Sequence, residues 1–142
     1  MNDKTINKLI LIQENIKKLN IKNENPPQII CISKTFALSK ISPLIDYGHI
    51  HFGENKVQEA EQKWFDVKNK NKNIKLHMVG RLQTNKVKKA VQIFDFIHSV
   101  DSQKLAENLK KREEEINKKL SYFIQINLGN ESQKGGINKN ET

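Results

Sequence analysis

The 142-residue sequence contains only one cysteine, Cys31. A single thiol cannot form an internal disulfide, and it also excludes a metal site made of cysteines alone. No apolar run approaches the roughly 20 residues that span a membrane, and the polar opening Met1 to Lys4 does not resemble a signal peptide. These absences predict a cytoplasmic protein with no membrane partner, and no pattern in the sequence indicates a metal site.

Arginine is also scarce. Only Arg81 and Arg112 are arginines, so the formal net charge of +9 comes almost wholly from lysine. A basic surface favours anionic ligands and nonspecific contact with nucleic acids. Bidentate phosphate contacts prefer arginine, however, and the sequence shows no aromatic stacking platform or known nucleic-acid-binding motif. A nonspecific basic nucleic-acid-binding module therefore stays open as an alternative, and specific nucleic-acid recognition is not expected.

Hydrophobic periodicity predicts helices and strands that alternate along the chain. The predicted strands cover residues 29–34, 50–52, 74–79, 94–99 and 122–128. The predicted helices cover residues 3–20, 39–47 and 54–68 and two stretches that begin at Thr84 and at Asp101 or Ser102. Such alternation is typical of parallel strands joined by crossover helices. Two architectures fit, an open doubly wound sheet and part of an eight-stranded barrel, and the first turn lacks the glycines usual in the doubly wound sheet.

The first strand, Ile29 to Lys34, ends on a lysine that we single out. Strand alternation predicts that Ile30, Ile32 and Lys34 share one face. An apolar surrounding would lower the pKa of the Lys34 amine and favour its attack on a carbonyl group. The alternative is that Lys34 is the polar end of an ordinary strand and reaches into solvent, and the local residues alone favour this alternative.

Polar residues follow four of the predicted strands. They are Lys34-Thr35, Gly53-Glu54-Asn55, Gly80 to Gln83, and Ser99 to Asp101. In βα barrels the carboxyl ends of the strands form the rim that holds the active site, so a site is expected there. The alternative is that some of these residues only cap the following helices, which we favour for Thr84 and Asp101 but not for Lys34 and Asn55.

Five sequence blocks in this order resemble the pyridoxal-phosphate homeostasis protein family. The blocks are Ser33-Lys34-Thr35, Phe52 to Glu59 (FGENKVQE), His77 to Lys86 (HMVGRLQTNK), His98 to Asp101 (HSVD), and Gln125 to Leu128 with Glu131 to Gly136. They lie within residues 29–137. The resemblance implies an α/β fold of the TIM-barrel type, like the N-terminal domain of alanine racemase. It also implies a pyridoxal 5'-phosphate (PLP) cofactor held as an aldimine on Lys34, and a role in vitamin B6 balance.

The resemblance also suggests roles for further residues. Asn55 would lie beside the cofactor ring, and Lys134 matches a lysine on a mobile loop with a part in cofactor exchange. Met78 would pack on the ring or in the core, and core packing is favoured. His77, on the opposite strand face, is expected to be structural. The family has no established enzymatic turnover, so we expect no catalytic residues, and PLP-dependent apoenzymes are the expected recipients of the cofactor.

The sequence departs from the family in three ways. Leu76 stands where many members have tryptophan, and Lys56 where many have tyrosine. Only about five of the eight βα units are present, and the family's later strands supply its phosphate cradle. We therefore predict one partial barrel domain over residues 1–142, with an N-terminal helix and linker (1–28), βα repeats (29–128) and a mobile polar tail (129–142).

This reading makes the chain a truncated copy, with open sheet edges through which copies could associate. A second alternative is a fragment of a racemase-like, fold-type III PLP-dependent enzyme. Such enzymes carry an additional β-domain, for which the 142 residues leave no room.

Overall fold

A five-stranded, fully parallel sheet forms the centre of the protein, with its strands in the order β1-β2-β3-β4-β5. The computed structural model describes residues 3–19, 26–129 and 135–138. The strands are β1 (Cys31–Ile32), β2 (His51–Glu54), β3 (Lys75–Met78), β4 (Phe96–Val100) and β5 (Ser121–Ile124). Strands that are neighbours in sequence are thus neighbours in space, as they are in a βα barrel.

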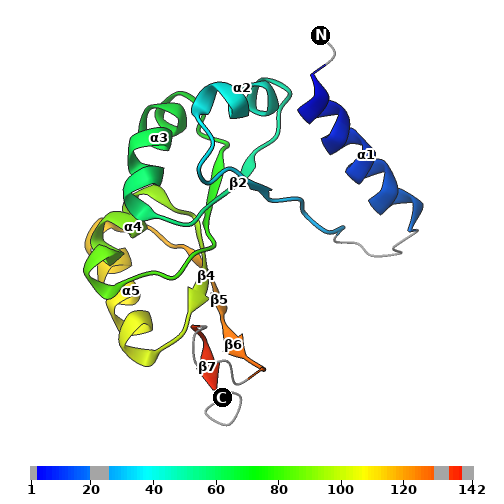
Figure 1. Cartoon of the computed structure of the whole chain (residues 1–142). Helices are drawn as coiled ribbons and strands as arrows, with labels where there is room; N and C mark the ends of the chain where they lie inside the picture. The colour runs from blue at the N-terminus through cyan, green and yellow to red at the C-terminus, as the bar shows by residue number, and fades with distance from the viewer. Residues whose placement is uncertain (1–2, 20–25, 130–134, 139–142) are drawn as a thin grey trace.

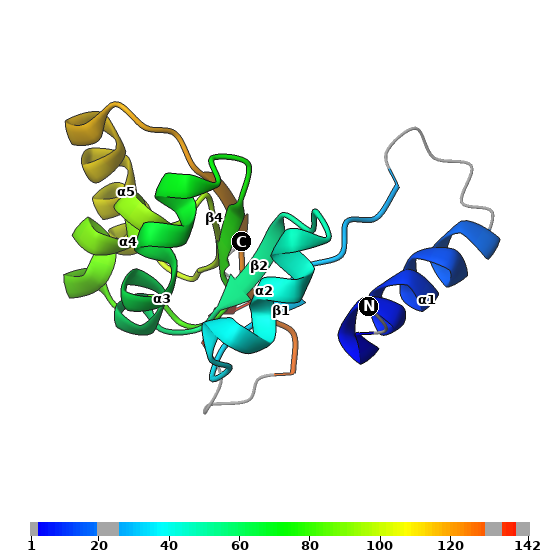
Figure 2. The same ribbon diagram turned by 90° about the horizontal axis from the view of Figure 1, so that it is seen from above.

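The helices lie on one face of this sheet (Figure 1). They are α2 (Leu38–Asp46), α3 (Val57–Lys70), the short 3₁₀ helix η1 (Thr84–Lys86), α4 (Val87–Ile93) and α5 (Gln103–Ile116). Helix α1 (Lys4–Lys18) contacts α2 and lies at the opposite end of the molecule from α4 and α5 (Figure 2). The order of elements confirms the predicted alternation of strands and helices.

The hydrophobic core lies between the sheet and its helices. Phe52 of β2 and Trp64 of α3 are fully buried, with ring centroids 4.8 Å apart. Helix α3 forms because apolar residues recur along one side of it, and Val57, Ala60 and Trp64 are its buried positions. Since Phe52 points toward the helices, alternation places its neighbours His51 and Gly53 on the other side of the sheet.

That other side, which we call the open face, is covered by no helix in the described part of the chain. The residues assigned to it by strand alternation and side-chain contacts are Ile32, His51, Gly53, His77, Phe96, His98 and Phe123. Ile32 is 45% exposed and Phe123 is 51% exposed. In a closed barrel the corresponding face is the packed interior, so this sheet has the form of part of a barrel wall.

Several predicted boundaries are wrong. β1 contains two residues, Cys31 and Ile32, where a strand over 29–34 was predicted, because only these residues pair with β2. Glu54 belongs to β2 and does not begin the following helix. Helix α3 continues to Lys70, into a stretch that was expected to be a loop.

The predictions for helix ends had mixed outcomes. Ser102 caps α5, since its hydroxyl accepts a hydrogen bond from the Leu105 amide at 3.2 Å. Gly48 follows α2 with a φ of 99°, as expected for a glycine at a helix C-terminus. The prediction that Thr84 caps a helix is wrong, because it is the first residue of η1.

The polar tail contains an element that was not predicted. β6 (Ile126–Asn127) and β7 (Ile137–Asn138) form a separate two-stranded parallel sheet. The expected continuous strand over residues 122–128 is therefore divided between β5 and β6.

The loops after β2 and β3 approach so closely at Gly80 that only glycine fits. A Cβ atom at this position would lie 2.4 Å from the Asn55 carbonyl oxygen and 2.8 Å from the Asn55 Cα. Both clashing atoms belong to backbone, which cannot swing aside as a flexible side chain can. The absence of a side chain at Gly80 thus allows two of the loops in which the site is expected to pack against each other.

We expect Gly80→Ala to lower the free energy of unfolding by about 1–3 kcal/mol, the usual cost of forcing extra atoms into a packed region. Urea unfolding followed by circular dichroism measures the change. Gly135→Ala is the matched control, because its Cβ would meet its nearest neighbour at an ordinary 3.4 Å. Equal stability of the two variants would contradict the close-approach argument.

Candidate functional site

Lys34 lies in a turn directly after β1, at the carboxyl-end rim of the sheet. The preceding residue Ser33 is buried and bonded to Glu54, whereas Lys34 is exposed. Ile32, on the open face two residues earlier, is 45% exposed. The expected apolar surrounding of Lys34 is therefore not found, because nothing in the described residues stands opposite this part of the open face.

The turn that carries Lys34 has an unusual backbone conformation. Thr35 has a φ of 67°, in the left-handed region that β-branched residues rarely adopt. The Thr35 amide donates a hydrogen bond of 2.7 Å to Oε1 of Glu59 on α3. The Phe36 amide donates to the Ser33 carbonyl oxygen at 3.2 Å and closes the turn. Strained backbone of this kind persists when its surroundings fix it, and it is concentrated at functional sites.

A buried carboxylate lies beneath this turn. Glu54, at the end of β2, is completely buried. Its Oε1 accepts hydrogen bonds from the Ser33 hydroxyl at 2.8 Å, from the Trp64 indole N–H at 2.9 Å and from Lys63 Nζ at 3.0 Å. Its Oε2 has no hydrogen-bond partner among the described residues. Burying a carboxylate is costly unless it is bonded and paired, and Ser33 after β1 and two residues of α3 supply those partners.

Lys63 of α3 connects this carboxylate to the turn. Its Nζ donates to the Ser33 carbonyl oxygen at 2.9 Å and to Glu54 and Glu59 at 3.0 Å each. The hydrogen bond from Lys63, followed by that from the Thr35 amide, lowers the pKa of Glu59 from its ordinary value. Glu59 is therefore ionised at neutral pH and forms a salt bridge with Lys63.

Asn55 is half-buried just beyond β2. It does not cap α3, because the capping position is held by Lys56, whose side chain makes no capping bond. Asn55 Oδ1 is buried and has no hydrogen-bond partner in the described part of the structure. A buried amide oxygen without a partner is rare in native proteins, so this atom is available to a ligand.

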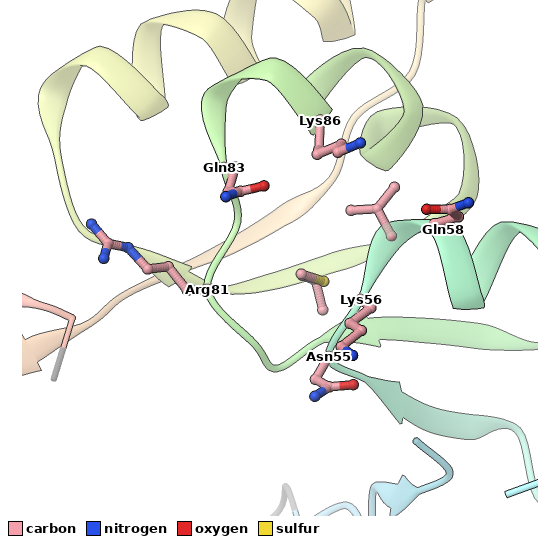
Figure 3. Close-up of a pocket in the computed structure, with 8 residues that line it drawn as sticks. Asn55, Lys56, Gln58, Arg81, Gln83 and Lys86 are labelled. Atoms are coloured by element: carbon pink, nitrogen blue, oxygen red, sulfur yellow. The ribbon is translucent and has the colours of Figure 1, made fainter. Parts of the chain in front are cut away.

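A pocket of about 380 Å³ opens beside Asn55, between the loops after β2 and β3 (Figure 3). It is lined by Asn55, Lys56, Val57, Gln58, Met78, Arg81, Gln83 and Lys86. Three of these residues are cations and none is acidic. The Arg81 Nε lies 3.6 Å from Oδ2 of Asp101, whereas Lys56 and Lys86 form no salt bridge with any described residue. The pocket therefore attracts anions.

The two remaining predicted site residues have different outcomes. Met78 is 1% exposed and belongs to the hydrophobic core, on the helix-covered face of β3, where it also borders the pocket. Its contact with a cofactor ring stays a prediction. Lys134 lies outside the described residues.

A row of histidines on the open face was missed by the sequence analysis, which treated only His77 and only as structural. His51 Nδ1 lies 2.9 Å from His77 Nε2, and His77 Nδ1 lies 2.9 Å from His98 Nε2. His77 also stacks on Phe96 with centroids 4.2 Å apart. The signal was present, since each of β2, β3 and β4 carries a histidine at a position that alternation assigns to one face.

Burial dominates the electrostatics of this row. It lowers the pKa of His77 to about 4, with a smaller contribution from repulsion by His98. Burial likewise lowers the pKa values of His51 and His98. Neutral rings suit the row, because each can donate one hydrogen bond and accept another.

In the described ranges no group of three or more histidine, cysteine or acidic side chains could hold a metal ion, and no helix is long and apolar enough to cross a membrane.

The chain is similar to proteins of a known family. Residues 8–142 match the family described as "Alanine racemase, N-terminal domain". The chain belongs to the alanine racemase N-terminal domain family. The pyridoxal phosphate homeostasis protein of Pasteurella multocida is 34% identical over 136 residues, which are 94% of this chain and 58% of that protein. The resemblance seen in the sequence blocks is confirmed, and the chain spans a little under three fifths of this curated relative.

Solved structures in the family share the fold. PipY of Synechococcus elongatus is 35% identical, and its structure without PLP has a TM-score of 0.77 over 92% of this chain and 60% of PipY. A structure of PipY with PLP bound gives 0.73 over 89% and 58%. Alanine racemase of Clostridium difficile, at 14% identity, has a TM-score of 0.65 over 92% of this chain and 33% of its own. The predicted alanine racemase-like α/β fold is thereby confirmed.

The low pKa of His77 predicts an acid-sensitive fold. Between pH 6.5 and about 4 the unfolded chain takes up a proton at His77 and the folded chain does not. Stability from this group is therefore complete above pH 6.5 and falls as the pH approaches 4. We expect a loss of about 2 kcal/mol from His77, measured as urea unfolding free energy at pH 7 and pH 4.5. His77→Gln should flatten the dependence, and an unchanged slope in that variant would exclude His77 as its source.

Proposed function

We propose that this chain binds PLP covalently through Lys34 and serves in PLP homeostasis. The observation that carries the proposal is the position of Lys34, an exposed amine on a fixed turn at the carboxyl-end rim of a barrel wall. The relatives support it, because a 35% identical protein has been solved with PLP bound. Since the chain covers only 58% of that structure's length, the activity of the whole relative is itself part of the proposal.

The residues present fit part of the cofactor. PLP supplies an aldehyde, which condenses with a primary amine to form a C=N bond with loss of one water. Lys34 provides that amine, and the unpartnered Oδ1 of Asn55 can accept a hydrogen bond from a ligand. The phosphate is a dianion, and the cations around the rim pocket draw it toward this edge of the sheet. A closed phosphate cradle is not formed by the described residues.

We further propose that the protein holds and delivers the cofactor to PLP-dependent apoenzymes and does not turn over a substrate. The names of the relatives support this role, since they are homeostasis proteins. The polar groups around the Lys34 turn support it as well. Ser33, Glu59 and Lys63 are engaged in holding the turn, so they serve structure where a catalyst would need a free acid or base.

The absorption spectrum with PLP tests the proposal. We expect a yellow band from the C=N bond, fixed on Lys34 by borohydride and located there by peptide mass spectrometry. Lys34→Ala should remove at least nine tenths of the fixed cofactor. Lys40→Ala, which removes an exposed lysine of α2, should leave it unchanged. Equal labelling of many lysines, unaffected by Lys34→Ala, would refute a specific site.

The basic rim should accelerate PLP binding. Replacing Lys56 and Lys86 together by glutamine should lower the association rate constant several-fold at low salt, because the pocket loses charges that attract the phosphate. The rate of the wild-type chain should also fall with added NaCl more steeply than that of the variant. Stopped-flow absorbance measures both rates. Glutamine at Lys110 and Lys111, exposed residues of α5, is the control with equal charge, and an equal effect there would assign the steering to net charge alone.

A further inference from the structure

We propose that Lys63, together with Glu59 and Glu54, positions the Lys34 amine and sets its reactivity. This inference rests on the proposed covalent role of Lys34. The three charged residues belong to β2 and α3, so Lys34 receives its support from the neighbouring βα unit and not from its own strand.

The hydrogen bonds of this network converge on the two residues that flank Lys34. Before it, Ser33 is held through its carbonyl oxygen by Lys63 and through its hydroxyl by Glu54. After it, Thr35 is held through its amide by Glu59. Lys63 bonds to both carboxylates and so joins the two halves. The backbone on either side of Lys34 is therefore fixed to one helix.

The network also accounts for the left-handed conformation of Thr35. A β-branched residue at a φ of 67° relaxes to negative φ unless something holds it. The 2.7 Å bond from its amide to Glu59 is formed in this conformation, and Lys63 orients that carboxylate at 3.0 Å. Relaxation of Thr35 would rotate the chain at Lys34 and turn the amine away from the rim.

Holding α3 on the sheet does not explain the network. The contact of Trp64 with Phe52 and the burial of Val57 and Ala60 already fix this helix by packing. Lys63 is a charged residue with a side chain only 9% exposed, and buried ion pairs add little to stability compared with apolar packing. Their recognised advantage is to specify one geometry, and here the geometry specified is that of the Lys34 turn.

The test compares Lys63→Met, which is unbranched like lysine, one atom shorter and uncharged, with Lys63→Arg, which keeps the charge. A cofactor-free readout comes first: the rate at which acetic anhydride modifies Lys34 between pH 7 and 10, with Lys40 as the internal reference. We expect Lys63→Met to slow modification of Lys34 relative to Lys40 at least threefold at pH 8, because the turn that carries Lys34 is then no longer held in one conformation. Lys63→Arg should restore most of the rate. Lys89→Met, which breaks the exposed pair with Glu61 on the same helical layer, should have no effect.

The second readout is the rate of C=N bond formation with PLP, which should fall at least fivefold in Lys63→Met and recover in Lys63→Arg. Glu59→Gln decides the matter if Lys63→Met does not fold. Glu59 is partly exposed, so its variant should fold, and the same slowing of Lys34 modification is expected. A folded variant with the wild-type rate in the acylation assay would overturn the inference.

The acylation assay also separates this inference from the proposed function. A wild-type chain that forms no specific bond with PLP but shows the Lys63-dependent reactivity of Lys34 would refute the proposed function and support the inference about Lys63.

Discussion

The buried carboxylate of Glu54 is the constraint on which the rest of this site depends. A carboxylate with no exposure must find its partners inside the protein, and Glu54 finds them on two other elements, at Ser33 after β1 and at Lys63 and Trp64 on α3. Satisfying one charge therefore fixes the spacing of β1, β2 and α3. The Lys34 turn follows Ser33 directly, so its position relative to β2 and α3 is fixed by the same hydrogen bonds. The unpartnered Oε2 shows that the fit is incomplete among the described residues.

The sheet is covered on one face only, and this asymmetry divides the roles of its residues. Positions that face the helices hold core residues, such as Phe52, and residues that support the Lys34 turn, such as Glu54. Positions on the open face carry the groups that would meet a ligand or an opposing barrel wall, such as Ile32 and the histidine row. Because adjacent residues of a strand point to opposite faces, β2 places a structural residue and a potential ligand-facing residue side by side.

The same alternation explains how far the sequence could predict the structure. Periodicity of two and of 3.6 residues located nearly every strand and helix, and the place of Lys34 at a strand end followed from it. Periodicity does not say which face of a strand is buried, so Lys34 was expected among apolar side chains that are in fact exposed. It also assigned Glu54 to a helix. A charged residue at the end of a buried strand can be recognised only when its partners are known, and here they are Ser33, Lys63 and Trp64. The histidine row required knowledge of register between strands, which one sequence does not contain.

The residues that hold the Lys34 turn lie directly after β1 and within β2 and α3. Ser33, Glu54, Glu59, Lys63 and Trp64 lie within 32 positions of one another, on the face that the helices already cover. Nothing on the open face is needed to hold the Lys34 turn. The electrostatic attraction for a phosphate is located elsewhere, in the loops after β2 and β3. The proposed covalent capture by Lys34 and the attraction for a phosphate therefore depend on different parts of the fold. The described residues hold the Lys34 turn through hydrogen bonds, whereas the exposed cations attract an anion without enclosing it.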